Sequence, residues 1–169
     1  MNILMSAGLL YSWAGDVALE FTQSNANMFI LGLIFFLLAH VMYLSVFITT
    51  PGENSILGKR VYLMIPVILF GSALVVFLYK DLGDMKIPVI IYAVVILLML
   101  AGAINRIEKV KMKSYLMVLA GAILFVISDS TIAINKFSMP FKASDFVIMA
   151  TYIAAQYLII TGYIYQYRD

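Results

Sequence analysis

The sequence has 169 residues, of which 64% are hydrophobic and 12% charged, and its formal net charge at pH 7 is +2. Soluble domains carry roughly a quarter of charged residues, so this composition excludes a soluble globular protein, and the basic residues form no stripe or tail of the kind that binds nucleic acid. The absence of cysteine excludes disulfides, thiolate nucleophiles and cysteine-ligated metals. We therefore expect a membrane protein whose chemistry depends on oxygen atoms and one imidazole.

Apolar runs long enough to cross a hydrocarbon core of ~30 Å follow one another along the chain. They lie at 3–21, 27–48, 61–79, 87–104, 114–135 and 144–166. The polar connections between them are short, and none could form a separate domain. The sequence predicts an all-α, polytopic transmembrane helix bundle of about six helices, with a single domain over residues 1–169.

Lysine and arginine are unevenly shared between the two sets of alternate connections. One side holds Lys59, Arg60, Arg106, Lys109, Lys111, Lys113 and Arg168, and the other holds Lys80, Lys86, Lys136 and Lys142. The positive-inside rule then places both termini in the cytoplasm. Because the chain is compact, we expect it in a bacterial inner membrane.

Two carboxylates lie inside predicted spans. Asp16 in the first span and Asp129 in the fifth are each under ~10 Å of helix rise from the outer boundary, so they could meet across the bundle. An ionisable side chain at the bilayer centre costs on the order of 3 kcal/mol, so such residues usually face a cavity and carry function. The pair is the candidate catalytic set, and the alternative is that each residue only hydrogen-bonds neighbouring helices together.

Further polar side chains accompany the two carboxylates. They are Ser12, His40, Tyr43, Ser128, Tyr152 and Gln156, which could contact a ligand or only hydrogen-bond neighbouring helices. A metal site would need His40 with both aspartates, and no motif spacing supports one, so we predict no metal.

Other polar residues near the outer boundary have simpler explanations. We expect Ser130 and Thr131 to hydrogen-bond carbonyls of the preceding helical turn. Asp145 follows Ser144 at a helix start, where capping would explain both residues.

A weak internal repeat relates residues 11–43 to residues 124–157. His40 and Tyr43 lie 24 and 27 residues after Asp16, and Tyr152 and Gln156 lie 23 and 27 residues after Asp129. Each repeat unit holds an even number of helices, so both units begin on the same side of the membrane and the repeat is parallel. With a unit of four helices, the second copy would be complete and the first would lack two N-terminal helices.

Four ordered motifs resemble those of a known family. They are GLLYSWAGD at 8–16, GLIFFLLAHVMY at 32–43, GAILFVISD at 121–129 and YIAAQ at 152–156. In content and order they resemble the YhhN-like lysoplasmalogenase family over essentially the whole chain. The resemblance implies a multi-pass protein of eight helices, of which the first two would precede Met1.

The resemblance also implies an activity, which is hydrolysis of the vinyl ether bond of lysoplasmalogens without a cofactor. The products would be a fatty aldehyde and glycerophosphoethanolamine or glycerophosphocholine. One of Asp16 and Asp129 would protonate the β-carbon, and the other would stabilise the oxocarbenium ion and activate water. The resemblance implies that His40, Tyr43, Tyr152 and Gln156 bind the ether oxygen or head group of the substrate and orient the carboxylates, and Ser12 and Ser128 complete the expected substrate-binding set. The expected partners are a lysophospholipid-type substrate and the bilayer.

Two other functions fit the same residues. A proton-coupled transporter could use the aspartates as a proton relay, and its flux in proteoliposomes would depend on a pH gradient. A non-catalytic lipid-binding protein would bind lysolipid without releasing a product.

Overall fold

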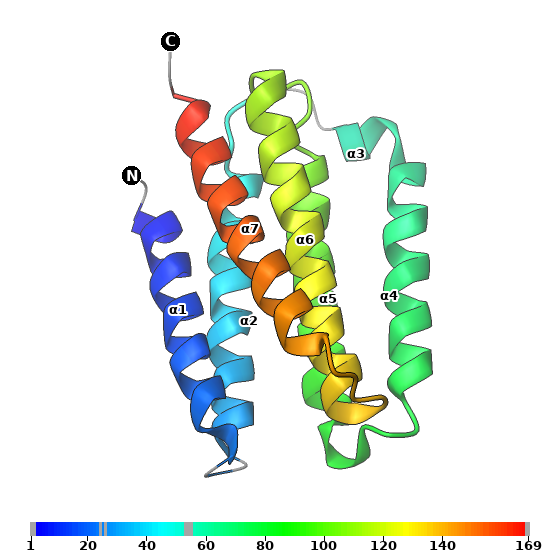
Figure 1. Cartoon of the computed structure of the whole chain (residues 1–169). Helices are drawn as coiled ribbons and strands as arrows, with labels where there is room; N and C mark the ends of the chain where they lie inside the picture. The colour runs from blue at the N-terminus through cyan, green and yellow to red at the C-terminus, as the bar shows by residue number, and fades with distance from the viewer. Residues whose placement is uncertain (1–2, 24, 26, 53–55, 168–169) are drawn as a thin grey trace.

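The computed structural model describes residues 3–23, 25, 27–52 and 56–167, and all regular structure in these ranges is helical (Figure 1). The long helices are α1 (Ile3–Glu20), α2 (Asn27–Ile48), α4 (Ile65–Leu78), α5 (Lys86–Ile104), α6 (Met112–Phe137) and α7 (Ser144–Tyr165). The short elements are α3 (Ile56–Lys59), η1 (Phe21–Gln23), η2 (Val61–Met64) and η3 (Gly83–Met85). The predicted all-α helical bundle is confirmed.

Five helical segments of the described chain are long and apolar enough to cross a membrane. They are α2, Val61–Leu78, Gly83–Ile104, α6 and α7. The first predicted span coincides with α1, which has 18 residues and is not among the five because Asp16 and Glu20 lower its hydropathy. Helix α1 lies alongside α2 (Figure 1). That α1 also crosses the membrane stays a prediction.

The bundle consists of two antiparallel helix pairs with a helix between them. Helix α1 packs on α2, α6 packs on α7, and α5 contacts both α2 and α6. Helix α4 lies at the periphery against α5 (Figure 1). The N-terminal end of α1 and the C-terminal end of α7 lie at the same end of the bundle, and the α1–α2 and α6–α7 connections lie at the other.

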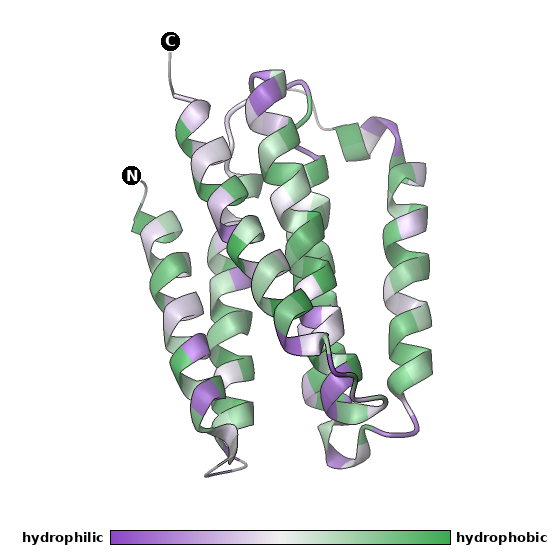
Figure 2. Cartoon of the chain, viewed as in Figure 1, coloured by the Kyte–Doolittle hydropathy of each residue, from purple (hydrophilic) through white to green (hydrophobic). Residues whose placement is uncertain are grey.

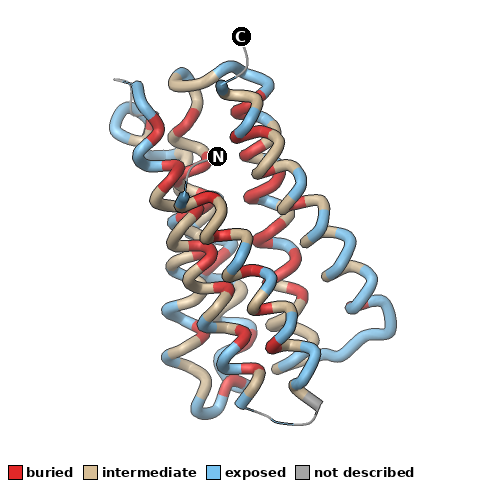
Figure 3. Tube along the Cα trace, turned by 90° about the vertical axis from the view of Figure 1, so that its left-hand side faces the viewer, coloured by how far each residue is buried: buried red, intermediate tan, exposed pale blue. Residues whose placement is uncertain are grey.

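The outside of the bundle is apolar, as a lipid-facing surface requires. Hydrophilic positions gather at the helix ends and in the lower parts of α1 and α6, whereas the outward faces of the helices are largely hydrophobic (Figure 2). Buried positions line the inward faces of the same helices (Figure 3). The polar side chains within the helices therefore have to find partners inside the bundle.

Glycine allows α6 and α7 to approach closely. A Cβ atom at Gly121 would lie 2.9 Å from the carbonyl oxygen of Ala155 and 3.0 Å from the backbone nitrogen of Ile159. A Cβ atom at Gly162 would lie 3.0 Å from the backbone nitrogen of Val118. Small residues at such crossings are a common means of helix association in membranes. The α6–α7 pair is thus a tightly packed scaffold.

A buried arginine ties the connection after α5 to its neighbours. The Arg106 side chain has no exposed surface, and its Nη2 atom donates hydrogen bonds to Gln166 Oε1 at 2.6 Å and to Ser114 Oγ at 3.4 Å. The guanidinium carbon lies 5.3 Å from the centroid of the Phe47 ring. Burial lowers the pKa of Arg106 to about 10, so the side chain is still protonated at neutral pH.

Candidate active site

A cleft of about 630 Å³ lies between the α1–α2 pair and the α6–α7 pair, with both Asp16 and Asp129 in its lining. Its volume is in the range of small-molecule sites, roughly 300–1,000 Å³. The two aspartates lie on α1 and α6, which run in the same direction, and each is near the C-terminal end of its helix. They therefore lie at a similar depth and border the same cleft. The structure thus brings together the two carboxylates that the sequence singled out.

Asp16 is half-buried on α1 and accepts a hydrogen bond from α7. The hydroxyl of Tyr152 donates to Asp16 Oδ2 at 2.7 Å. Tyr152 is itself positioned by aromatic contacts, with edge-to-face packing against Phe36 and Phe125. The carboxylate is therefore held in a fixed orientation by a rigid side chain from the opposite helix pair.

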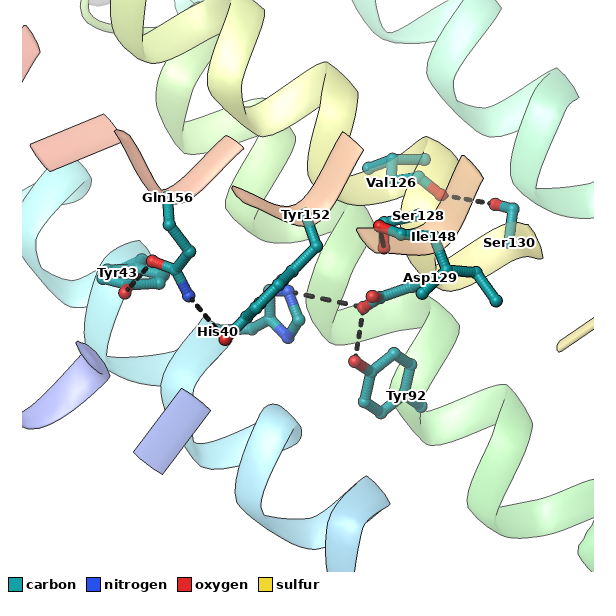
Figure 4. A network of polar contacts seen from close by, with 10 residues as sticks. All are labelled: His40, Tyr43, Tyr92, Val126, Ser128, Asp129, Ser130, Ile148, Tyr152 and Gln156. Carbon is teal, nitrogen blue, oxygen red and sulfur yellow. Dashed lines mark hydrogen bonds and ion pairs between the residues drawn. The ribbon is translucent and has the colours of Figure 1, made fainter. Parts of the chain in front are cut away.

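Asp129 is buried on α6 and has two polar neighbours (Figure 4). The hydroxyl of Tyr92 donates a hydrogen bond to Asp129 Oδ2. The Nε2 atom of His40 lies 3.6 Å from the same oxygen, which is longer than a hydrogen bond. His40 is fully buried and packs edge-to-face on Tyr92.

Tyr92 is the site residue that the sequence interpretation missed. It lies in the middle of α5, a helix with no carboxylate or histidine and no repeat partner in the chain. The one feature of the sequence that could have indicated Tyr92 is its place near the middle of a span. A tyrosine there cannot anchor at the membrane interface, so its hydroxyl needs a partner inside the bundle.

A second chain of contacts joins the remaining predicted residues to Asp16. Tyr43 on α2 donates a hydrogen bond to Gln156 Oε1 at 2.7 Å, and Gln156 Nε2 lies 3.5 Å from the Tyr152 hydroxyl (Figure 4). Ser12 is buried on α1 beside Tyr43. Side chains from α1, α2 and α7 therefore form one connected polar network inside the bundle.

The contacts between the two halves of the predicted repeat are reciprocal. Tyr152 of the second half donates to Asp16 of the first, and His40 of the first half approaches Asp129 of the second. Tyr43 and Gln156, which lie 27 residues after the two aspartates, hydrogen-bond each other. Each half thus supplies one carboxylate and a partner for the other carboxylate.

The small hydroxyl residues of α6 hydrogen-bond backbone carbonyls. Ser128 Oγ donates to the carbonyl of Ile148 on α7 at 3.2 Å (Figure 4). Ser130 donates to Val126 at 2.6 Å and Thr131 to Ile127 at 2.8 Å, as expected for residues that bond the preceding turn. In this structure Ser128 links α6 to α7, and a role of Ser128 in substrate binding stays a prediction.

The mouth of the cleft carries both signs of charge. Glu20, Lys136 and Asp145 all line it. The prediction that Ser144 and Asp145 cap a helix is wrong, because Ala143 occupies the cap position of α7 and no side chain bonds there. The physical reason is that α7 begins one residue earlier than a Ser144 cap would require, so Ser144 is already helical. Asp145 then lies in the first turn and lines the cleft.

The described residues contain no group of three or more histidine, aspartate or glutamate side chains that could hold a metal ion. His40 and the two aspartates, the set that a metal would have needed, are thus not such a group, and the absence of a metal stays a prediction. The polar groups of the cleft are suited instead to proton transfer and hydrogen bonding.

Comparison with known proteins connects this geometry to a family. The model of the YhhN family matches residues 1–163. Among curated proteins, the chain is 36% identical over 156 residues to Lysoplasmalogenase TMEM86A of Bos taurus, an alignment that covers 90% of this chain and 61% of the relative. It is 33% identical over 162 residues to Lysoplasmalogenase TMEM86A of Homo sapiens, with 90% and 61% covered.

A bacterial relative is more distant. The chain is 28% identical over 140 residues to Lysoplasmalogenase of Mycobacterium tuberculosis, with 81% of this chain and 51% of the relative covered. The chain thus spans about three fifths of the length of its mammalian relatives and about half that of the mycobacterial one. No solved structure matches it. The match to the family model over nearly the whole chain shows that this protein belongs to the YhhN family.

Proposed function

We propose that this chain hydrolyses the vinyl ether bond of lysoplasmalogens within the membrane. The observation that carries the proposal is the pair of aspartates in one cleft, each accepting a hydrogen bond from a tyrosine of another helix. The relatives named lysoplasmalogenase support the same activity.

The reaction needs an acid and a carboxylate. The substrate R–CH=CH–O–R′ accepts a proton on its β-carbon, and the electron pair of the double bond forms the new C–H bond. The resulting oxocarbenium ion is stabilised by the second carboxylate, which also takes a proton from the attacking water. The hemiacetal then breaks its bond to the O–R′ oxygen, which gives the fatty aldehyde R–CH2–CHO and the alcohol HO–R′.

Asp16 and Asp129 fill these two roles in the proposal. Tyr152 and Tyr92 act as positioning residues, since each fixes one oxygen of an aspartate and leaves the other oxygen for the substrate or water. Electrostatic groups held in place before the reaction cost no reorganisation when charge develops. His40 is the second polar neighbour of Asp129, beside Tyr92.

The charged mouth of the cleft suits a zwitterionic head group. A phosphate carries negative charge and would approach Lys136, whereas an ammonium group would approach Glu20 or Asp145. This arrangement agrees with glycerophosphoethanolamine or glycerophosphocholine as the water-soluble product.

The test is release of fatty aldehyde by purified protein in detergent, measured by mass spectrometry. We expect aldehyde from an alkenyl lysophospholipid, and no cleavage of the matched acyl ester or saturated alkyl ether. Absence of aldehyde from folded protein would contradict the proposal. Flux of a solute driven by a pH gradient in proteoliposomes would then favour the transporter.

The role of Tyr92 can be tested with Tyr92→Phe. Loss of one hydrogen bond to a carboxylate is expected to lower kcat about tenfold, which corresponds to ~1.4 kcal/mol, while KM changes little. The matched control is Tyr62→Phe, because Tyr62 is 56% exposed and lies outside the cleft. Unchanged kcat in Tyr92→Phe would show that the Tyr92 hydroxyl does not position the reacting carboxylate.

We also propose that the ends of α1 and α7 face the cytoplasm of a bacterium, with the mouth of the cleft on the outer side of its inner membrane. Because the sequence has no cysteine, single-cysteine variants can report the orientation directly. In intact spheroplasts a membrane-impermeant maleimide should label Lys142→Cys, whereas Lys113→Cys should react only after permeabilisation. The reverse pattern would invert the orientation.

A further inference from the structure

Asp129 borders more than the polar cleft. A narrow cavity of about 50 Å³ extends from Asp129 and Tyr92 between α4, α5 and α6, and it is lined almost entirely by apolar side chains. A second small cavity, of about 40 Å³, borders both the cleft and the first cavity. It shares Leu19, Phe29 and Phe36 with the cleft, and Val89, Tyr92 and Ala133 with the first cavity. The first cavity is the one that leads away from the cleft.

That cavity adjoins a wide groove on the outer face of the bundle. The groove lies between α4 and α5, has a volume of about 620 Å³ and contains Ser72 as the sole polar side chain of its lining. The cavity and the groove share Gly71, Val75, Ala93 and Leu97. The structure thus places an apolar route between the buried carboxylate and the lipid-facing surface.

The loose packing of α4 fits such a route. Of its 14 residues only Gly71 and Leu78 are buried, and the helix stands apart from the core in Figure 1. Gly71 faces the side chain of Leu97, which can rotate, so a flexible side chain lies at the boundary between cavity and groove. A flexible chain can pass there more easily than between α6 and α7.

The proposed reaction sets a requirement that this route meets. In a lysoplasmalogen the vinyl ether lies between a polar glycerophosphate group and a single long hydrocarbon chain. If the vinyl carbons lie at the aspartates and the head group occupies the polar cleft, the chain has to leave the site along an apolar path. The apolar cavity that borders the α4–α5 groove meets the cleft at Asp129.

Resting on the proposed function, we propose that the α4–α5 groove binds the hydrocarbon chain of the substrate, which passes Tyr92 and Ala93 on its way to the lipid. Lipid tails are as apolar as the groove, so its shape rather than its hydrophobicity selects the chain. The same opening lets a lysolipid enter sideways from the bilayer, and the groove makes chain length a determinant of specificity.

The binding site can be mapped without any hydrolysis. The probe is a saturated alkyl-ether lysophosphoethanolamine with a diazirine at the end of its chain, which contains no vinyl ether to cleave. We expect labelled peptides from α4 and α5, at levels above those given by a diacyl phospholipid that carries the same diazirine. Labelling of α1 or α2 instead, or no labelling above that control, would overturn the proposal.

A matched pair of substitutions tests specificity. Ala93→Phe fills the junction between cavity and groove, whereas Ala73→Phe makes the same change on the exposed face of α4, away from every hollow described above. We expect Ala93→Phe to reduce labelling and to lower kcat/KM for a hexadecenyl substrate at least about tenfold relative to an octenyl one. Ala73→Phe should leave that ratio unchanged. An equal loss for both chain lengths in Ala93→Phe would indicate general damage and overturn the proposal.

The two experiments separate this proposal from the proposed function. Labelling of α4 and α5 by a protein that releases no aldehyde would contradict the hydrolase and retain the chain site. Aldehyde release without labelling of the groove would support the hydrolase and contradict the chain site.

Discussion

Replacement of Asp129 by asparagine is expected to lower kcat/KM for a lysoplasmalogen by about 10²- to 10⁴-fold, the usual contribution of a positioned acid or base. Asparagine has nearly the same shape and can still accept the hydrogen bond from Tyr92, so the packing around it should persist. It can neither give a carboxylic proton nor carry negative charge. The loss should therefore appear in turnover rather than in folding.

Asp16→Asn should have an effect of similar size, because the reaction needs both carboxylates. The matched control is Asp84→Asn, since Asp84 is exposed in the α4–α5 connection outside the cleft. Aldehyde release by each variant, with size-exclusion chromatography and thermal unfolding to check the fold, is the measurement. Full activity in either cleft variant would contradict the two-carboxylate mechanism.

The double variant sharpens the same test. Residues that act as one catalytic unit are strongly non-additive, so Asp16→Asn combined with Asp129→Asn should be scarcely slower than either single variant. Multiplication of the two single effects would show instead that the aspartates act in separate steps or at separate places.

The sequence predicted the helices and the carboxylate pair for a physical reason. Bilayer thickness sets the length of an apolar run, so the six predicted spans coincide with helical segments without any knowledge of tertiary structure. The meeting of Asp16 and Asp129 in one cleft followed from their similar depth on helices of the same direction. Both properties depend on how far a residue lies along the membrane normal, and spacing in the sequence gives this distance directly.

Properties that depend on how helices are arranged around that axis were not predictable. Tyr92 lies on a helix with no polar pattern, and its contact with Asp129 exists because α5 packs beside α6. The sequence Ser144-Asp145 at a helix start predicts a capping role for both residues. In the structure Asp145 lies in the first turn of α7 and lines the cleft. The groove between α4 and α5 depends likewise on which helices become neighbours.

The four motifs of the sequence meet in two pairs across the bundle. The first and fourth motifs meet through Asp16 and Tyr152, and the second and third meet through His40 and Asp129. Asp16 accepts its hydrogen bond from Tyr152 of the second half, and Asp129, which is bonded by Tyr92 of its own half, has His40 of the first half as a neighbour, so the observed site needs both halves. The site is therefore expected to fail when the α6–α7 pair is displaced from α1 and α2.

Gly121→Ala should lower the free energy of unfolding by about 1–3 kcal/mol, which is the usual cost of overpacking. The added Cβ would meet backbone atoms of Ala155 and Ile159 on α7 at 2.9 and 3.0 Å, and backbone cannot rotate away. The two helices would therefore have to separate. Because α6 carries Asp129 and α7 carries Tyr152, this separation would also disturb the site.

The matched control is Gly71→Ala, where the added methyl group meets only the flexible side chain of Leu97. Thermal unfolding in detergent should show a midpoint several degrees lower for Gly121→Ala than for Gly71→Ala. Aldehyde release by Gly121→Ala should also fall below that of the wild type at temperatures where both remain folded. Separation of α6 and α7 would shift Asp129 relative to Tyr152, the residue that holds Asp16. If the two glycine variants unfolded at the same temperature, close contact between the α6 and α7 backbones would not be what holds the site together.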